Sequence, residues 1–590
     1  MIQNRYNIKP ILLTFFVTIC FSLKGQTGRD SVLLTAMQHE LKRNMDELHK
    51  DDFDKPFFIG YTIADVHRKS VTARLGALVQ SGENRQKDWN IRVMVGDYQM
   101  NDENFTSNIE DNQANRITYP MPLENDYLGI RRALWSQTDR IYHIAAAIYK
   151  QKKSLVEKKK VDEKLLGRAD FSKEPTVVMH VPATYSDIDL PSLEERAKVV
   201  SEIFQQYPSL YNSNVTVNHA LADVYFVNSE GSEVVYPVGM SSISVMANVI
   251  SDENINVMGN LSYNAMQVDQ LPSLEMVEKD ISYMVNDIMS ADEHEKYDDY
   301  YSGPVLLLDD VVVDVLESLL FADGHKLIAH RTPLKRTDQF LPDYSIGSNN
   351  QNNWEIGKKI LDDDITVIDY SKLPIYSDSA LWGSFPVDAE GVVPPDSMVM
   401  VENGILRNKY NGRTPADDVD GSNGHNRHSV SGYGISQNVA PGILKITATS
   451  TISHSDLKAR LIQLAREEGY KYGILIRPAP VRADNAPYEF YKIDVESGKE
   501  TRLVNVAFES VNDREFMRVA GFSDQVYVKN KLFSPESMNH DNGYMSMVQS
   551  GVPVTYMVPS GILLERVDIV NQDQPMQFVQ PVVKSPLFQD

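Results

Sequence analysis

The stretch DVVVDVLESLLFADGHKLIAHR, from Asp310 to Arg331, joins an apolar helical pattern to two histidines five residues apart. Its apolar residues recur at helical spacing: Val312, Val315, Leu316, Leu319 and Leu320. Positions i, i+3, i+4, i+7 and i+8 share one face of a helix, so the stretch predicts a helix packed against the rest of a domain. On this pattern Glu317 is expected on the outward face. Gly324 is expected to end the helix and to leave His325 and His330 beyond it.

The same stretch raises the question of a metal site. Asp323, His325 and His330 are of the residue types that bind zinc, and three such ligands would suffice for a catalytic ion. The alternative is that both histidines are ordinary residues of a loop and of the segment after it. The stretch by itself leaves both interpretations open.

The remaining sequence predicts an α+β protein of two domains. After residue 27, a helix at 31–50 precedes three short alternating runs between 57 and 100, which predict an antiparallel meander. Long helices follow near 129–160, 191–208 and 273–290, and an acidic linker near 290–303 marks the boundary. We therefore expect an N-terminal domain at 27–300, a sheet with long packed helices. A larger β-rich C-terminal domain at 301–590 should bury the 310–331 helix against its sheets.

The N-terminus indicates export. Arg5 and Lys9 precede an apolar run from Ile11 to Leu23, and small or polar residues follow it, which is typical of a signal peptide at 1–26. A signal anchor is the alternative. Cys20 is the only cysteine, so the mature chain has no disulfide, zinc–thiolate site or cysteine nucleophile. An exported protein of this size without disulfides is expected in the periplasm of a Gram-negative bacterium.

The charge excludes some partners. The chain carries a net charge of −23, and removal of the basic leader residues Arg5, Lys9 and Lys24 gives −23 − 3 = −26. So acidic a protein is not expected to bind nucleic acid or an anionic membrane surface. No later stretch is apolar enough to span a bilayer, so the mature chain should have no membrane span.

Common catalytic signatures are absent from the sequence. There is no phosphate-binding loop ending in Lys-Ser or Lys-Thr, no dinucleotide fingerprint, no HExxH and no GxSxG.

The segment GSFPVDAEGVVPPDSMVMVENGILRNKYNGR, from Gly383 to Arg413, resembles a segment of the TldD/PmbA family in which a Gly-rich turn precedes DDEG and then IENGIL. Other stretches resemble the family in the same order: SGPVLLL, GKKILDDDITVID, NGHNRHSVSGYGISQNVAPGILKI, YKIDVESGKETRLVNVAF and SGVPVTYMVPSGILLERVDI. The stretch LGIRRALWSQTDRIYHIAAAIYKQKKSL is similar to exported TldD-related members. The resemblance covers nearly all of the mature chain.

The resemblance implies a zinc peptidase site, which this sequence lacks in part. Active members carry His-Glu-x-x-x-His on a helix and a cysteine in a late loop, and the glutamate takes a proton from the zinc-bound water. Here the corresponding helix is the opening stretch, where Glu317, Ser318, Leu319 and Asp323 stand at or near the motif and no register restores it. The late loop offers Tyr544, Met545 or Ser546 in place of the cysteine. The metal site is therefore expected to be degenerate.

Loss of the ligands predicts a non-catalytic family member that needs no cofactor. By resemblance it would be a PmbA-like partner of a TldD-like catalytic subunit, or a homodimer, that binds peptide or unfolded polypeptide. Two alternatives stay open: a divergent metallopeptidase with zinc held by Asp323, His325 and His330, and a structural or interaction protein that reuses the fold. In the loop GSNGHNRH, the residues His425, Asn426 and His428 could contact peptide, or could lie on an exposed loop.

Overall fold

The computed structural model describes most of the chain in stretches separated by gaps. The described residues are 30–50, 52–107, 120–182, 185, 187–251, 254–290, 294–321, 326–335, 337, 354–429, 436–483, 486–508, 511, 513–533, 551–571, 583 and 585–587. Three predicted features lie outside them: the signal peptide at 1–26, the residues Asp323 and His325, and the late loop around Tyr544, Met545 and Ser546.

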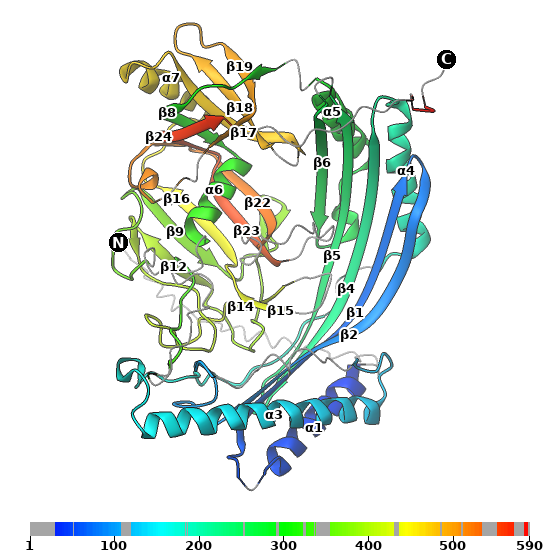
Figure 1. Cartoon of the computed structure of the whole chain (residues 1–590), viewed down its shortest axis with the longest axis vertical. Coiled ribbons are helices and arrows are strands. Elements are labelled where there is room, and N and C mark those ends of the chain that lie inside the picture. Colours follow the sequence, from blue (N-terminus) through cyan, green and yellow to red (C-terminus); the bar gives the residue numbers. More distant parts are fainter. Residues whose placement is uncertain are drawn as a thin grey trace, which may run out of the picture.

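A curved antiparallel sheet forms the N-terminal half (Figure 1), with strand order β2–β1–β4–β5–β6. Its strands are β1 Pro56–Arg74, β2 Ala77–Val95, β4 Asn212–Asn228, β5 Glu233–Ile250 and β6 Asn256–Ala265. The prediction of three short strands between 57 and 100 is wrong, because β1 and β2 form one long hairpin. Its turn uses positive φ angles at Leu75 (48°) and Gly76 (82°), a combination that suits the twist of a tight hairpin.

Two groups of helices cover the face of this sheet to which odd-numbered β1 residues point. The helices are α1 Asp30–Glu47, α3 Tyr127–Glu157, α4 Leu190–Glu202 and α5 Leu274–Met289. At one end, Ile59 and Tyr61 share a buried cluster with α1 and α3. At the other end, Val71 and Ala73 share a second cluster with α4 and α5. Because side chains alternate along a strand, the even-numbered residues face the C-terminal half instead.

Two sheets and an enclosed helix form the C-terminal half. One sheet contains β8 Tyr301–Leu308, β17 Tyr472–Ala483, β18 Ala486–Asp494, β19 Glu500–Val504 and β24 Gly561–Asn571. The other has the order β13–β12–β9–β16–β23–β22, with bounds Ile405–Leu406, Ser397–Glu402, Ile365–Tyr370, Ile443–Ala448, Val552–Pro559 and Val526–Phe533. Helix α6, Asp310–Phe321, shares one large core with both sheets, and α7, Leu457–Glu467, covers the outer face of the first.

Short elements complete the described chain. The strands are β3 Val178–His180, β7 Glu295–Lys296, β10 Ile375–Tyr376, β11 Ser379–Ala380, β14 Asn426–Ser429, β15 Ser436–Val439, β20 Val506–Phe508 and β21 Val519–Phe522. The 3-10 turns are η1 Glu163–Leu165, η2 Ile203–Gln206, η3 Val268–Gln270, η6 His454–Asp456 and η7 Glu515–Met517.

The predicted α+β class is confirmed, with a helix-covered N-terminal sheet and a β-rich C-terminal half. Strand pairing crosses between the two halves, at Asn260 of β6 with Arg482 of β17 and at Phe105 with Leu334. Figure 1 shows the C-terminal half lying against the curved sheet. The boundary at residue 300 stays a prediction.

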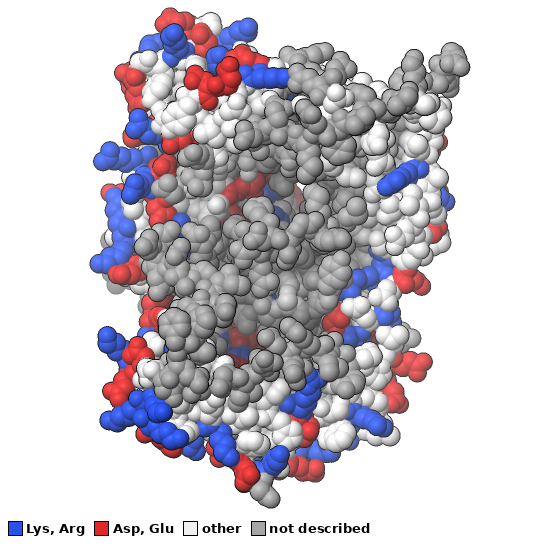
Figure 2. Space-filling model, in the orientation of Figure 1, with Lys and Arg blue, Asp and Glu red and all other residues white. Residues whose placement is uncertain are grey.

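The surface charge and the length of the helices relate to two predictions, the acidic character of the chain and the lack of a membrane span. Figure 2 shows basic and acidic side chains mixed along the lower edge of the molecule, where Figure 1 places α3. Within the described part of the chain, no helix is both long and apolar enough to cross a membrane.

Candidate functional site

Helix α6 occupies the position where the sequence raised the question of metal binding. It follows β8 through Asp309, whose φ is 50°. The predicted inward stripe is confirmed, because every member of it is buried: Val312, Val315, Leu316, Leu319 and Leu320. The described helix runs to Phe321, while Gly324 lies outside the described residues.

Glu317 is buried, at 9% exposure, so the predicted outward orientation is wrong. The helical period could not reveal that strand β22 closes over this side of the helix. Lys531 of β22 places its Nζ 3.1 Å from Oε1 of Glu317 and 2.9 Å from Oδ1 of Asp314. Burial raises the pKa of the Glu317 carboxyl, and the Lys531 ammonium opposes that rise.

The Glu317 contact belongs to a row of ion pairs between α6 and β22. Lys529 Nζ lies 2.7 Å from Asp310 Oδ2, next to the Lys531 pairs with Asp314 and Glu317. The acids lie four and then three residues apart on the helix, and the lysines two apart on the strand, so each set shares one face. We call these five residues the α6–β22 charge ladder.

The residues of α6 do not fit a zinc ion. When Glu317 is placed on the glutamate of His-Glu-x-x-x-His, the two histidine positions fall on Leu316 and Phe321, which are buried and offer no donor atom. The Phe321 ring packs against Tyr410 and Phe533. Ser318 and Leu319 complete the turn, and the Lys531 ammonium, which Asp314 shares, already lies against Glu317. A zinc ion would meet like charge and hydrocarbon here.

The relocated zinc site stays a prediction. Of its three residues, only His330 is described, and its carbonyl oxygen accepts from the Asp417 amide at 2.8 Å. Asp323 and His325 lie outside the described residues. Among the residues that the structure does describe, no three histidine or acidic side chains gather closely enough to hold a metal ion.

Of the three residues predicted to contact peptide, the two histidines lie away from the large cavity and the asparagine lines it. His425 is fully buried, with Nδ1 2.8 Å from the Asn423 carbonyl oxygen and Nε2 3.1 Å from Oδ1 of Asp369. His428 packs near the Tyr236 ring, and burial lowers its pKa to about 3. Neither histidine lines the large cavity described next, whereas Asn426 does.

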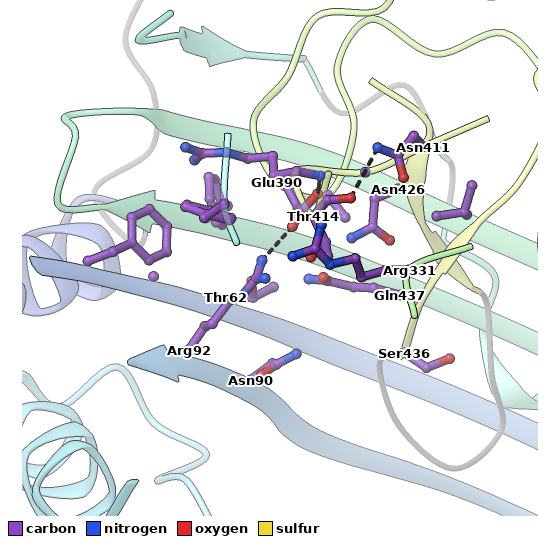
Figure 3. A pocket seen from close by; sticks show the side chains of 18 of the residues that line it. Thr62, Asn90, Arg92, Arg331, Glu390, Asn411, Thr414, Asn426, Ser436 and Gln437 are labelled. Carbon is purple, nitrogen blue, oxygen red and sulfur yellow. Dashed lines mark hydrogen bonds and ion pairs between the residues drawn. The ribbon is translucent and has the colours of Figure 1, made fainter. Parts of the chain in front are cut away.

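A cavity of about 670 Å³ lies between the N-terminal sheet and the C-terminal half (Figure 3). The sheet contributes even-numbered residues of β1 and β2, including Thr62, Asn90 and Arg92. The C-terminal half contributes Glu390, a loop at 411–416, and residues of β14 and β15. We call this space the interdomain cavity.

The loop containing Asp388-Ala389-Glu390-Gly391 contributes to one wall of the cavity and is held there by hydrogen bonds and close packing. Glu390 accepts from Arg92 Nη1 at 2.5 Å and from the Arg413 amide at 2.7 Å. Buried Asp388 accepts from the amides of Glu390 and Val392 at 2.9 and 2.8 Å, and burial beside Glu390 raises its pKa. Gly391 has φ 77°, and a Cβ there would lie 2.9 Å from the Phe226 ring. Glycine is needed because no side chain fits between this loop and the N-terminal sheet.

Arg413 forms hydrogen bonds that hold the opposite side of the cavity in place. Its guanidinium donates twice to Glu230, at 2.6 and 2.7 Å, and to the Ser172 carbonyl oxygen. It also lies 3.9 Å from the centre of the Phe171 ring. The side chain is 1% exposed, so the ion pair joins the two halves inside the protein.

Arg331, by contrast, uses only part of its hydrogen-bonding capacity within the protein. Its Nη2 lies 3.2 Å from Oδ1 of Asp170 and 3.5 Å from the Arg168 carbonyl oxygen. Its Nε is buried and has no hydrogen-bond partner among the described residues. Burial lowers the pKa of this guanidinium, and Asp170 opposes that change.

Sequence reasoning missed most of this cavity. Nothing in the local sequence marks Arg92 or Arg331, because each lies in an ordinary stretch and meets its partners only in the folded chain. Glu390 and Arg413 lie within the segment that carries the family resemblance, so that segment could have identified them.

Comparison with known proteins agrees with this architecture. Residues 302–470 match the model of the PmbA/TldA metallopeptidase C-terminal domain. No curated protein matches the sequence.

Solved structures share the fold across almost the whole chain. A candidate modulator of a DNA gyrase from Thermotoga maritima is 14% identical, with a TM-score of 0.51 over 90% of this chain and all of that one. TldE from Thermococcus kodakarensis is 13% identical, with a TM-score of 0.50 over 91% and 100% of the two chains. A candidate modulator of DNA gyrase from Bacteroides thetaiotaomicron is 12% identical, with a TM-score of 0.52 over 92% and 99%.

The matched domain and the shared fold define a metallopeptidase-related protein built from a helix-covered curved sheet and a β-rich C-terminal half. Residues 302–470 thus match the family that the sequence resemblance predicted, and the chain as a whole shares the fold of the solved structures.

Proposed function

We propose that this protein is a non-catalytic member of the family that binds peptide or unfolded polypeptide without cleaving it. One observation carries the proposal: Lys531 lies against Glu317, on the turn of α6 where the resemblance places the zinc motif. The ammonium lies 3.1 Å from Glu317, the one residue of the motif that is of the required type.

The charge of Lys531 opposes zinc chemistry in two ways. A catalytic zinc needs three protein ligands and a neighbouring base that can take a proton from bound water. Leu316 and Phe321 supply no ligand atom, and the Glu317 carboxylate is engaged by the ammonium. A second cation beside Lys531 would also be repelled at close range.

The interdomain cavity supports the binding part of the proposal. Its volume is in the range of ligand sites, and it lies between two halves of the molecule, a common place for such sites. Side-chain amides of Asn90, Asn426 and Gln437 line it. Each amide can both donate and accept, as the peptide groups of any polypeptide can.

Elemental analysis of the purified full-length chain tests the loss of catalysis. We expect far less than one zinc per chain after incubation with zinc and dialysis, and no cleavage of fluorescein-labelled casein. One zinc per chain that disappears in His325→Ala or His330→Ala would refute the proposal and establish the relocated metal site.

Fluorescence anisotropy with the same unfolded casein tests binding. We expect saturable binding by the full-length chain and no change in the casein fragment pattern. Absence of binding would instead favour the alternative of a structural or interaction protein that reuses the fold without handling polypeptide.

We further propose that the protein works with a second family subunit, either a TldD-like catalytic chain or a second copy of itself. The support is the fold shared with TldE, together with the degenerate α6. Light scattering after size-exclusion chromatography, alone and mixed with a TldD-like chain from the same genome, is expected to show a dimer. A monomer in both samples would contradict this.

Export to the periplasm is likewise proposed, from the charged and apolar pattern of residues 1–26. Fusion of these residues to a phosphatase that folds only outside the cytoplasm should give active enzyme. A fusion that stays inactive and cytoplasmic would contradict export.

A further inference from the structure

The interdomain cavity holds three side-chain amides that the described structure leaves without a hydrogen-bond partner. Asn90 comes from β2, Asn426 from β14 and Gln437 from β15 (Figure 3). By contrast Asn411, in the same wall, donates to the carbonyl oxygens of Thr414 and Gly421. Asn411 therefore shapes the wall, whereas the other three amides can bind a ligand.

Arg331 adds an unsatisfied cation to the same wall. The other two arginines of the cavity are saturated, Arg92 by Glu103 and Glu390, and Arg413 by Glu230. Arg331 forms an ion pair with one acid, Asp170, at 3.2 Å, and Asp417 adds a weaker attraction.

Asp170 does not neutralise Arg331 fully, because it serves a second cation. Lys152, 3% exposed, places its Nζ 2.5 Å from Oδ2 of Asp170, and the same oxygen accepts from the Asn101 amide at 2.9 Å. One carboxylate is thus shared by two buried cations. With Nε of Arg331 also unpartnered among the described residues, the group retains both charge and donors for a ligand.

A carboxylate matches these donors best. The planar guanidinium presents parallel N–H groups that pair with two carboxylate oxygens, and such charge-assisted bonds are stronger than neutral ones. Amides that donate and accept match the peptide groups next to that carboxylate.

We infer that the interdomain cavity binds a short polypeptide segment by its carboxylate, with Arg331 on the carboxylate and Asn90, Asn426 and Gln437 on neighbouring peptide groups. The inference rests on the proposed polypeptide binding and deepens it. The carboxylate comes from the chain terminus or from an Asp or Glu side chain, and the experiment separates these sources.

Isothermal titration calorimetry on the full-length chain tests this with three acetylated probes. They are tetra-alanine with a free carboxyl terminus, tetra-alanine amide, and Ala-Ala-Glu-Ala amide. We expect one or both carboxylate probes to bind about tenfold more tightly than the neutral amide. Preference for the first identifies the terminus, and equal preference for the third identifies any peptide carboxylate.

Substitution of Arg331 assigns the effect to that residue. Arg331→Gln should reduce carboxylate affinity about tenfold, to the level of the neutral amide, without changing the affinity of the amide. The matched control is Arg407→Gln, since Arg407 forms an exposed ion pair with Glu402 outside the cavity. Gln437→Glu provides an independent variant if Arg331→Gln does not fold, because the added carboxylate should weaken binding of the acidic probes more than binding of the neutral amide.

The outcomes separate this inference from the proposed function. Equal affinity for acidic and neutral probes, or no effect of either cavity variant, overturns the inference, while casein binding would still support the function. Inorganic phosphate that binds as tightly as the acidic peptides also overturns it, because the site would then accept any anion. If neither casein nor any tetrapeptide binds, both proposals fail.

Discussion

The α6–β22 charge ladder and the interdomain cavity are both built from shared charges, but they differ in the charge left over and in the side chains around it. In the ladder three acids meet two lysines: Asp310 faces Lys529, while Asp314 and Glu317 share Lys531, and Oε2 of Glu317 has no hydrogen-bond partner among the described residues. In the cavity two cations, Arg331 and Lys152, share the Asp170 carboxylate, and Nε of Arg331 has no hydrogen-bond partner among the described residues.

Their surroundings differ: Leu316 and Phe321 beside Glu317 offer no ligand atom, whereas the amides of Asn90, Asn426 and Gln437 line the cavity. A buried charge is tolerated when it is paired, and a donor left unpaired next to amides can still bind a ligand. The cavity therefore keeps hydrogen-bond donors for a ligand, whereas the side chains at 316 and 321, on either side of Glu317, offer no zinc ligand.

Removal of Arg413 should have the largest effect, because it breaks the saturated part of the cavity wall. Arg413→Ala leaves Glu230 largely buried without its bidentate partner, which should destabilise the protein by about 4 kcal/mol. Urea unfolding followed by tryptophan fluorescence measures the change. Arg407→Ala, which removes an exposed pair, should cost less than about 1 kcal/mol. Equal shifts for the two variants would show that the interdomain pair is not needed.

Removal of Lys531 tests the ladder directly. Lys531→Met leaves Glu317 and Asp314 without their cation and should cost about 3 kcal/mol in unfolding free energy. The double variant Glu317→Gln with Lys531→Met should recover part of the loss, because the most buried charge is then neutral. A double variant as unstable as the sum of the single ones would show that the two groups are not coupled.

Gly391→Ala should weaken the joint between the halves by about 2 kcal/mol, since the change adds both backbone strain and a clash with Phe226. Gly469→Ala is the matched control: its φ is 83°, but no atom would lie within 4 Å of the new Cβ. Limited proteolysis and thermal unfolding compare the two. The clash is disproved if both variants lose the same stability.

The smallest effect at neutral pH is expected for His428→Phe. Burial lowers the pKa of His428 to about 3, whereas the unfolded chain has the ordinary value of about 6.5. Between these values the unfolded state binds more protons, so stability falls as pH decreases through this window. The variant should match the parent near pH 7 and lose less stability than the parent at pH 4 to 5. Thermal unfolding across that range measures it, and parallel curves would exclude this histidine as the cause.

The sequence predicted those features that depend on local period or on family pattern. The stripe from Val312 to Leu320 lies buried as expected, and the α+β division holds. The orientation of Glu317 was missed because helical period describes one packed face, whereas α6 is enclosed by two sheets and closed by β22. Its partner Lys531 lies more than two hundred residues further along the chain.

The candidate site was predicted only in part for the same reason. Asn426 lies in the cavity wall, but the neighbouring His425 points to Asp369 within the core. Arg331 was treated only as the end of the opening stretch. Its role depends on Asp170 and Lys152, which come from the other half of the molecule.

The long β1–β2 hairpin has a consequence for folding accuracy. One strand of 19 residues carries the inward residues for two separate helix-covered cores, with Ile59 in one and Val71 in the other. Because side chains alternate, a slip of one residue would turn both sets toward the wrong face at once. The turn at Leu75 and Gly76 thus fixes the register on which both cores depend. A misaligned hairpin would lose both cores together, so it would not persist as a sheet that is correct in one half only.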